Sequence, residues 1–137
     1  MILIACVDDH GGMTFNNRRQ SRDKILQQRI LEKTQHSRLW MNHDSEKLFA
    51  GFYAPQLCAD EQFLRRAGAG EYCFVENVCV SSVESEVEKI LLYRWNRSYP
   101  ADRYFDIPLL DHGWRLAGST DFAGHSHAII TEEVYVR

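Results

Sequence analysis

The sequence lacks a long apolar segment and an excess of charge of one sign. None of its apolar runs approaches the ~20 residues that a membrane-spanning helix requires, so we expect no contact with a membrane interior. The chain carries 16 basic and 19 acidic side chains, which excludes a globally basic nucleic-acid binder but leaves room for a local basic patch. It also has no internal repeat and no low-complexity tract. These absences favour an ordinary globular protein.

Cysteine is scarce and has no pattern. Cys6, Cys58, Cys73 and Cys79 show no Cys-x-x-Cys spacing, and three of them lie among apolar neighbours. Such thiols are typically reduced core residues. The apolar start Met1–Val7 has no basic segment before it, so we expect no secretion signal and a cytoplasmic location.

What the chain does have is enough apolar material for one core. It has 137 residues, of which 45% are hydrophobic and 12% aromatic. A chain of this length buries roughly two thirds of the surface that its unfolded form exposes, so it needs no disulfide or metal to fold. We therefore expect residues 1–137 to form a single domain.

Strand-like and helical segments alternate through most of the chain. The predicted strands are Ile2–Val7, Arg38–Asn42, Tyr72–Val75, Lys89–Trp95, Trp114–Ser119 and Ala128–Val136. Predicted helices run from an N-cap at Ser21 to about Lys33 or Thr34, from Asp44 or Ser45 through Phe52, over Asp60–Arg66 and over Ser82–Glu88, and Asp8–Asn17 is a predicted loop. Gly124 between the last two strands predicts a hairpin. The pattern indicates an α/β fold with a mostly parallel central sheet, an antiparallel C-terminal hairpin and flanking helices.

The N-terminal motifs follow a distinctive order. An apolar strand ends in Val7-Asp8, Gly12-Met13 lies in the following loop, and Asp23 stands at the start of the first helix. This order resembles the opening of the dihydrofolate reductase family.

Further motifs extend the resemblance over most of the chain. Leu39-Trp-Met-Asn42, with Ser45 downstream, takes the place of the family's second strand and its threonine. The closing landmarks are Lys89–Trp95, Asp102, Phe105, Trp114 and Tyr135-Val-Arg137. The resemblance implies a dihydrofolate reductase-like fold, a pterin- or nucleotide-like ligand, and NADPH as the one cofactor that the family suggests.

We expect the loop Asp8–Arg22 and the start of the following helix to form a ligand-facing wall, because open α/β sheets bind ligands beyond the carboxyl ends of their strands. Asp23 would be its catalytic residue, a carboxylate that binds a protonated heterocycle through two hydrogen bonds. The alternative is a surface Asp that offsets the helix dipole, and in either case we expect Asp23→Asn to change stability by only ~0.3–1 kcal/mol. The implied ligand-binding residues are Val7, Gly12, Met13, Arg18, Arg19, Arg22, Asn42, Ser45, Glu76, Asn77 and Tyr93.

Several positions depart from the family pattern. Glu76-Asn77 replaces a Gly-Gly pair that lets the backbone approach the cofactor pyrophosphate, and a carboxylate there would repel it. Tyr93 replaces the threonine that partners the catalytic carboxylate, and Arg18–Ser21 replaces a Leu-Pro-Trp segment. The chain is also shorter where the family binds the adenosine side of the cofactor. The resemblance therefore implies the fold more strongly than the activity, and a divergent or inactive reductase fits it.

A second hypothesis starts from local charge. Between Asn16 and Arg38, seven Lys or Arg side chains stand against two acids. The Arg18/Arg19/Arg22 patch would suit RNA or another phosphate-bearing partner, and a phosphodiesterase would assign acid–base chemistry to His112, His125 or His127. The competing interpretation is a solvated helix face balanced by the acidic stretch Glu84–Glu88.

The spacing of His125 and His127 gives little indication of a metal site. His125 and His127 have a spacing that metals accept, but no third ligand is evident, so we expect an exposed pair and predict no metal site. A His-x-His fragment also occurs in ribonuclease Z, which requires the longer motif His-x-His-x-Asp-His to bind two zinc ions. Here Ala-Ile-Ile follows His127 in place of the Asp-His, so the sequence does not support that identity. The three tryptophans (Trp40, Trp95 and Trp114) are expected in the core.

Overall fold

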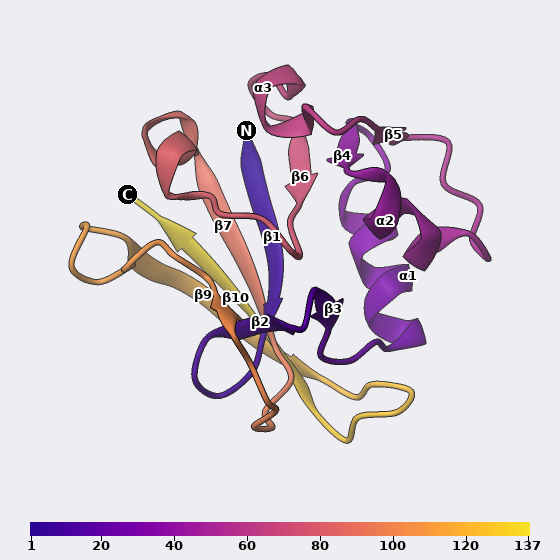
Figure 1. The fold of residues 1–137 in the computed structure, drawn as a ribbon, viewed down its shortest axis with the longest axis vertical. Coiled ribbons are helices and arrows are strands. Elements are labelled where there is room, and N and C mark those ends of the chain that lie inside the picture. Colours follow the sequence, from indigo (N-terminus) through magenta and orange to yellow (C-terminus); the bar gives the residue numbers. More distant parts are fainter.

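A computed structural model describes residues 1–137, and its centre is a seven-stranded sheet in the order β5-β4-β6-β1-β7-β10-β9 (Figure 1). β1 (Ile2–Val7) pairs in parallel with β6 (Tyr72–Phe74) on one side and with β7 (Lys89–Arg94) on the other. Its continuous apolar run is explained by this central place, because both of its faces are covered. No helix in the structure is both long enough and apolar enough to span a membrane.

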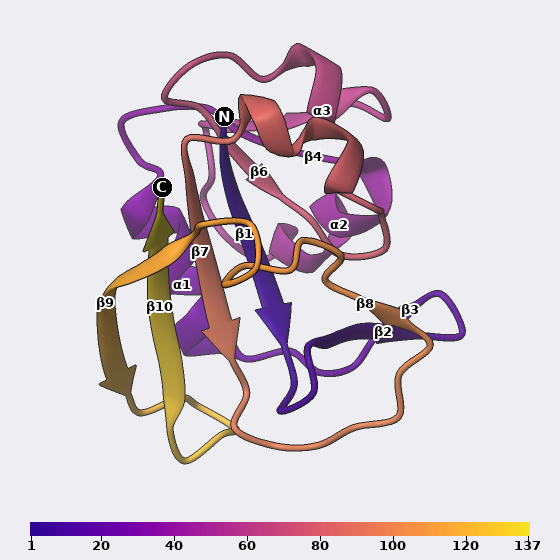
Figure 2. The same cartoon turned by 90° about the vertical axis from the view of Figure 1, so that its left-hand side faces the viewer.

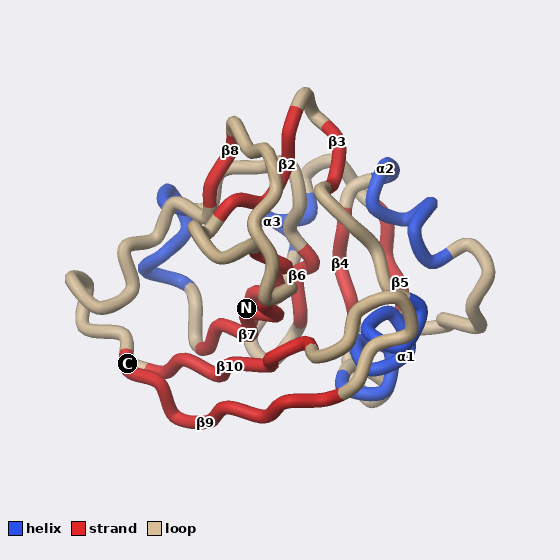
Figure 3. Tube along the Cα trace, turned by 90° about the horizontal axis from the view of Figure 1, so that it is seen from below, coloured by secondary structure: helices blue, strands red, loops and turns tan.

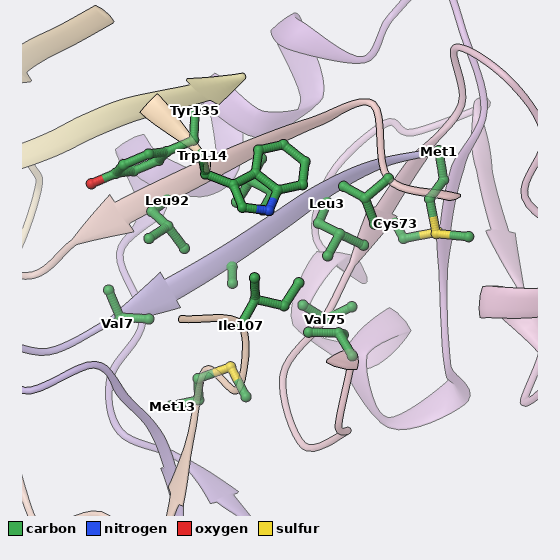
Figure 4. Packing of buried hydrophobic residues seen from close by; sticks show 14 of the residues in the cluster. Met1, Leu3, Val7, Met13, Cys73, Val75, Leu92, Ile107, Trp114 and Tyr135 are labelled. Carbon is green, nitrogen blue, oxygen red and sulfur yellow. The ribbon is translucent and has the colours of Figure 1, made fainter. Parts of the chain in front are cut away.

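The two faces of β1 belong to two separate cores. Leu3, Ala5 and Val7 lie in one apolar cluster, which Trp114 and Ile107 complete (Figure 4). Ile2 and Ile4 lie in the other cluster, which the helix α1 and the segment around Phe49 cover. This alternation is what a strand with a period of two residues produces. Trp40, Trp95 and Trp114 are all buried, as predicted.

The helix α1 (Lys24–Lys33) confirms that the first predicted helix exists and that it ends at Lys33, but its N-cap is a different residue from the predicted one. Asp23, not Ser21, is the N-cap, and its carboxylate accepts hydrogen bonds from the backbone N–H groups of Ile25 and Leu26. Ser21 was a plausible cap by residue type, but it lies three residues before the helix.

The second helical segment is shorter and starts earlier than predicted. Asn42, not Asp44 or Ser45, caps α2 (His43–Glu46), and a 3₁₀ helix η1 (Lys47–Phe49) follows it. The remaining short elements are β4 (Leu39–Met41), β5 (Leu57–Ala59), α3 (Phe63–Arg66) and the 3₁₀ helix η2 (Ser81–Glu86). Among these, β5 has no counterpart in the sequence prediction.

The segment predicted as an irregular loop contains part of a second sheet. β2 (Gly12–Phe15) pairs with β3 (Arg18–Arg19) and with β8 (Arg103–Tyr104), next to the carboxyl end of β1 (Figure 2). The turn between β2 and β3 is Asn16-Asn17, with φ of 50° and 62°. Asparagine tolerates this left-handed conformation, which a tight hairpin requires at both central residues.

The last two strands form the predicted antiparallel hairpin. β9 (Arg115–Phe122) pairs with β10 (Ile130–Val136), and β10 runs antiparallel to β7. α1 and the three-stranded sheet lie on opposite sides of the main sheet (Figure 3). The predicted α/β class, mostly parallel with an antiparallel C-terminal edge, is confirmed.

Candidate functional site

The strand order reverses at the carboxyl end of β1. The strands β6, β4 and β5 lie on one side of β1, and β7, β10 and β9 lie on the other. Open α/β sheets bind ligands in the crevice outside the carboxyl ends of their strands at such a switch point. The chain that leaves β4 and β6 at this edge carries Asn42 and Glu76-Asn77. The topology therefore makes this crevice the candidate ligand-binding site.

A polar cleft of about 520 Å³ lies in the crevice, and we call it the outer cleft. No apolar side chain lines it. Its walls come from the β2–β3 hairpin, from α2 and from the segment after β6. The lining residues are Thr14, Asn17, Arg18, Arg19, Asn42, Asp44, Ser45, Lys47, Glu76 and Asn77.

A second, far smaller space lies deeper, between α1 and the main sheet, and we call it the inner cavity. Its volume is about 20 Å³, which is room for roughly one water molecule. Apolar side chains, among them Met13, Leu26, Ile30 and Trp95, form about half of its lining. The cavity in this structure is too small for a heterocyclic ring.

An ion pair separates the two spaces. The Arg19 guanidinium donates two hydrogen bonds to the Glu76 carboxylate, at 2.8 and 2.9 Å, and the Ser45 hydroxyl donates a third at 2.8 Å. Both Arg19 and Glu76 line the outer cleft and the inner cavity. The carboxylate that was expected to repel a pyrophosphate therefore has a cation of this chain beside it.

The rest of the outer cleft is held by amide hydrogen bonds. The Asn77 oxygen accepts hydrogen bonds from the Thr14 hydroxyl and from Arg103, and its nitrogen donates to Asn17. Arg18 is exposed and has no hydrogen bond or ion pair through its side chain. The cleft thus combines a fixed polar wall with one unpaired guanidinium.

Asp23 lies on the inner cavity, but its carboxylate is already occupied by the protein. Besides its two N-cap bonds, it accepts hydrogen bonds from the backbone N–H groups of His125 and Ser126, at 2.8 to 3.0 Å, and from the Ser126 hydroxyl. The side chain has no exposed surface. The alternative of a surface Asp is therefore wrong, and the small effect on stability that was expected from a surface position loses its basis.

The same contacts set the protonation of Asp23. Burial of the carboxyl acts to raise its pKa, but the hydrogen bonds from His125, His127, Ser126 and Leu26 outweigh burial. The pKa of Asp23 is held well below its ordinary value of 3.8. The group is an ionised, fully hydrogen-bonded anchor between α1 and the loop before β10.

His127 is the partner that sequence reasoning missed. Its ring is buried, its Nδ1 lies 3.0 Å from Asp23 Oδ2, and it stacks on Trp95 with ring centroids 4.5 Å apart. The sequence analysis expected an exposed pair at 125 and 127, whereas only His125 is exposed. The one available signal was the apolar run Ala128-Ile-Ile that follows His127.

The structure divides the other predicted site residues among several places. Those that line the outer cleft are Arg18, Arg19, Asn42, Ser45, Glu76 and Asn77, and those that line the inner cavity are Met13, Arg19, Arg22, Asp23 and Glu76. Val7, Gly12 and Tyr93 line neither space. The Tyr93 hydroxyl instead donates to Glu132 at 2.7 Å, on the side of the sheet that packs against α1.

The proposed basic patch and histidine set are likewise dispersed. Arg19 is paired with Glu76, and Arg22 lines a separate open cleft beside α1. His112 contacts Glu84 at 2.9 Å. Glu84 and Glu88 contact His112 and the N-terminus and do not balance the α1 face.

The chain matches no protein-family model and no curated protein sequence. Among solved structures, it is similar to dihydrofolate reductase from Enterococcus faecalis complexed with NADP(H) and RAB-propyl. The TM-score is 0.71 at 13% identity, over 99% of this chain and 95% of that chain. This likeness shows a dihydrofolate reductase-like fold, in agreement with the motif order.

Proposed function

We propose that this dihydrofolate reductase-like domain binds a phosphorylated, nucleotide-like small molecule in the outer cleft. The observation that carries the proposal is the unpaired Arg18 guanidinium in a cleft that only polar and charged residues line. The cleft volume of about 520 Å³ is in the usual range for a small-molecule site, roughly 300–1,000 Å³. Its place at a strand-order reversal supports the same function.

The chemistry of the cleft suits phosphate oxygens. The Arg18 guanidinium is planar and has up to five N–H donors. It can donate two parallel hydrogen bonds to two oxygens of one phosphate. Lys47 adds a second cation, whose contact with Asp44 is long, at 3.5 Å, and largely exposed to solvent. Because Arg19 offsets the Glu76 carboxylate, the net charge at the cleft favours an anion.

The residues fit part of NADPH and not the whole of it. NADP(H) is present in the similar enterococcal reductase structure, and its phosphates would suit the outer cleft. The inner cavity of about 20 Å³ does not admit a nicotinamide ring or a pterin, and Asp23 has no free hydrogen-bonding position for one. We therefore derive no hydride transfer, and the proposed function is binding.

Calorimetric titration with ADP tests the proposal. Arg18→Ala should weaken ADP binding about tenfold, since one charge-assisted contact is worth on the order of 1.4 kcal/mol. Arg65→Ala is the matched control, because Arg65 is exposed on α3 and forms no ion pair. ADP affinity that falls equally in both variants, or in neither, would refute the assignment of the cleft.

A further inference from the structure

We propose that Ser21, His127 and Asp23 form a nucleophilic triad that transfers a small acyl group. The Ser21 hydroxyl lies 3.0 Å from His127 Nε2, and His127 Nδ1 lies 3.0 Å from Asp23 Oδ2. Serine, imidazole and carboxylate in this hydrogen-bonded order are the arrangement that activates a serine, and it recurs on unrelated folds. The site is separate from the outer cleft, so the proposal does not depend on the proposed function.

The carboxylate fixes the imidazole in the tautomer that a general base needs. A carboxylate only accepts hydrogen bonds, so His127 Nδ1 carries the hydrogen in this contact. The opposite nitrogen, Nε2, is then the acceptor that faces the hydroxyls. Trp95 stacks on the ring, with an interplanar angle of 27°, and restricts its rotation. Asp23 acts through His127 and is a positioning residue.

Two hydroxyls reach His127 Nε2, and their surroundings distinguish them. Ser21 is half-buried and lines the inner cavity, whereas the Tyr99 hydroxyl, 3.2 Å from Nε2, does not. A bound reactant can therefore approach Ser21. Tyr99 helps to hold the ring.

Donors for a developing oxyanion stand next to the nucleophile. The backbone N–H groups of Ser21 and Arg22 donate to no acceptor within the protein. Backbone N–H groups beside a nucleophile are the usual means of stabilising a tetrahedral intermediate. The Gln20 Oε1 atom is also buried without a partner on the wall of the same cavity, so it can accept a hydrogen bond from a bound molecule.

Two spaces limit the substrate: the inner cavity, which Ser21 lines, and an open cleft that shares Arg22 and Gln27 with it. The inner cavity of about 20 Å³ accepts an acetyl methyl group and excludes a longer chain. On the outside, Arg22 and Lys24 line an open cleft of about 500 Å³, which suits an anionic alcohol part. The structure thus points to acetyl esters of small anionic alcohols.

The chemistry balances without any cofactor. Ser21 Oγ attacks the carbonyl carbon while its proton passes to His127 Nε2. The C–O bond to the alcohol then breaks, and the same proton goes to the departing alcohol oxygen. Water next attacks the acetyl-serine and gives a proton to Nε2. This proton returns to Ser21 Oγ as acetic acid leaves, and the acid then gives its remaining proton to the solvent.

The test uses p-nitrophenyl acetate, with acetylated positions mapped by peptide mass spectrometry. We expect acetyl on Ser21 of the wild-type protein, and an initial burst of p-nitrophenol that falls ~100-fold or more in Ser21→Ala and His127→Gln. Ser98→Ala, which changes an exposed serine of the loop after β7, should retain the burst.

A second probe separates a specific site from general reactivity. p-Nitrophenyl octanoate should give no burst, since its chain exceeds the inner cavity. Melting curves of each variant show whether a lost burst reflects unfolding, and Ser21→Ala, which removes one half-buried hydroxyl, should remain folded. Acetylation confined to lysines, or an unchanged burst in folded Ser21→Ala, would overturn the triad.

Discussion

The Arg19 guanidinium and the Glu76 carboxylate form a two-bond ion pair that divides the polar outer cleft from the inner cavity. Glu76 stands where the dihydrofolate reductase pattern has glycine, and Arg19 lies in the segment that departs from the pattern ahead of α1. The two departures are therefore related in space. Together they place an ion pair between the outer cleft and the inner cavity of the candidate site.

Removing the negative charge of Glu76 from this ion pair should strengthen anion binding. Glu76→Gln removes the only carboxylate that contacts Arg19 and leaves the guanidinium free for a phosphate. We expect the Kd for ADP to fall by about 3–10-fold, equivalent to roughly 0.7–1.4 kcal/mol. Titration calorimetry measures it, and weaker ADP binding by this variant would show that Glu76 supports the ligand.

The wild-type protein should not reduce dihydrofolate with NADPH. An inner cavity of about 20 Å³ leaves no room for the two reacting rings, and enzymes depend on holding reactants together in a fixed geometry. The measurement is the loss of NADPH absorbance. Steady oxidation that requires both this protein and dihydrofolate would contradict the account.

Substitution of Asp23 should destabilise the fold. In Asp23→Asn, an NH₂ group faces N–H donors where the carboxylate accepted hydrogen bonds, and the side chain is fully buried. We expect a loss of about 2–4 kcal/mol and a melting temperature lower by about 5–15 °C. Asp111→Asn is the control, since Asp111 is exposed and has no side-chain bond, and its shift should stay within ~0.5 kcal/mol. Equal melting temperatures for the two variants would contradict the anchoring role.

Stability should decline in acid through Asp23 and Glu132. Burial acts to raise the pKa of each carboxyl, but the hydrogen bonds that each one accepts outweigh burial and leave both pKa values below normal. The donors to Glu132 are Arg29, Tyr93 and Lys33. A carboxyl with a lowered pKa in the folded state stabilises the fold above its ordinary pKa. That contribution is lost as the pH falls toward the folded-state value. Urea midpoints should therefore drop between neutral pH and about pH 3, and drop less in Asp23→Asn.

The sequence predicted six of the seven strands of the main sheet, all but β5, because these strands carry their own signal. Ile2–Val7 is a continuous apolar run, and the two C-terminal segments flank a turn. The strands β3 and β8 have two residues each and pair through backbone groups, so no side-chain pattern marks them. The strand β3 could be located only once Asn16-Asn17 was recognised as a tight turn, and β8 pairs with β2 from a distant part of the chain.

The candidate site was predictable where its residues follow strand ends. Asn42 and Glu76-Asn77 come after neighbouring parallel strands, so the topology brings them together. The contact between Asp23 and His127 joins residues 104 apart in the chain, and no local spacing encodes it. Sequence reasoning therefore identified Asp23 as important but assigned it to a ligand and not to His127.

Mapping of ADP on the protein by NMR tests the central claim most directly. The account predicts that ADP shifts the backbone amide signals of Arg18, Asn42, Ser45 and Asn77, which line the outer cleft. In Arg18→Ala, the shifts of the other three residues should need about tenfold more ADP. The signals of α3, none of whose residues lines the cleft, should not move. Shifts spread over the whole surface, or centred away from the outer cleft, would contradict the account.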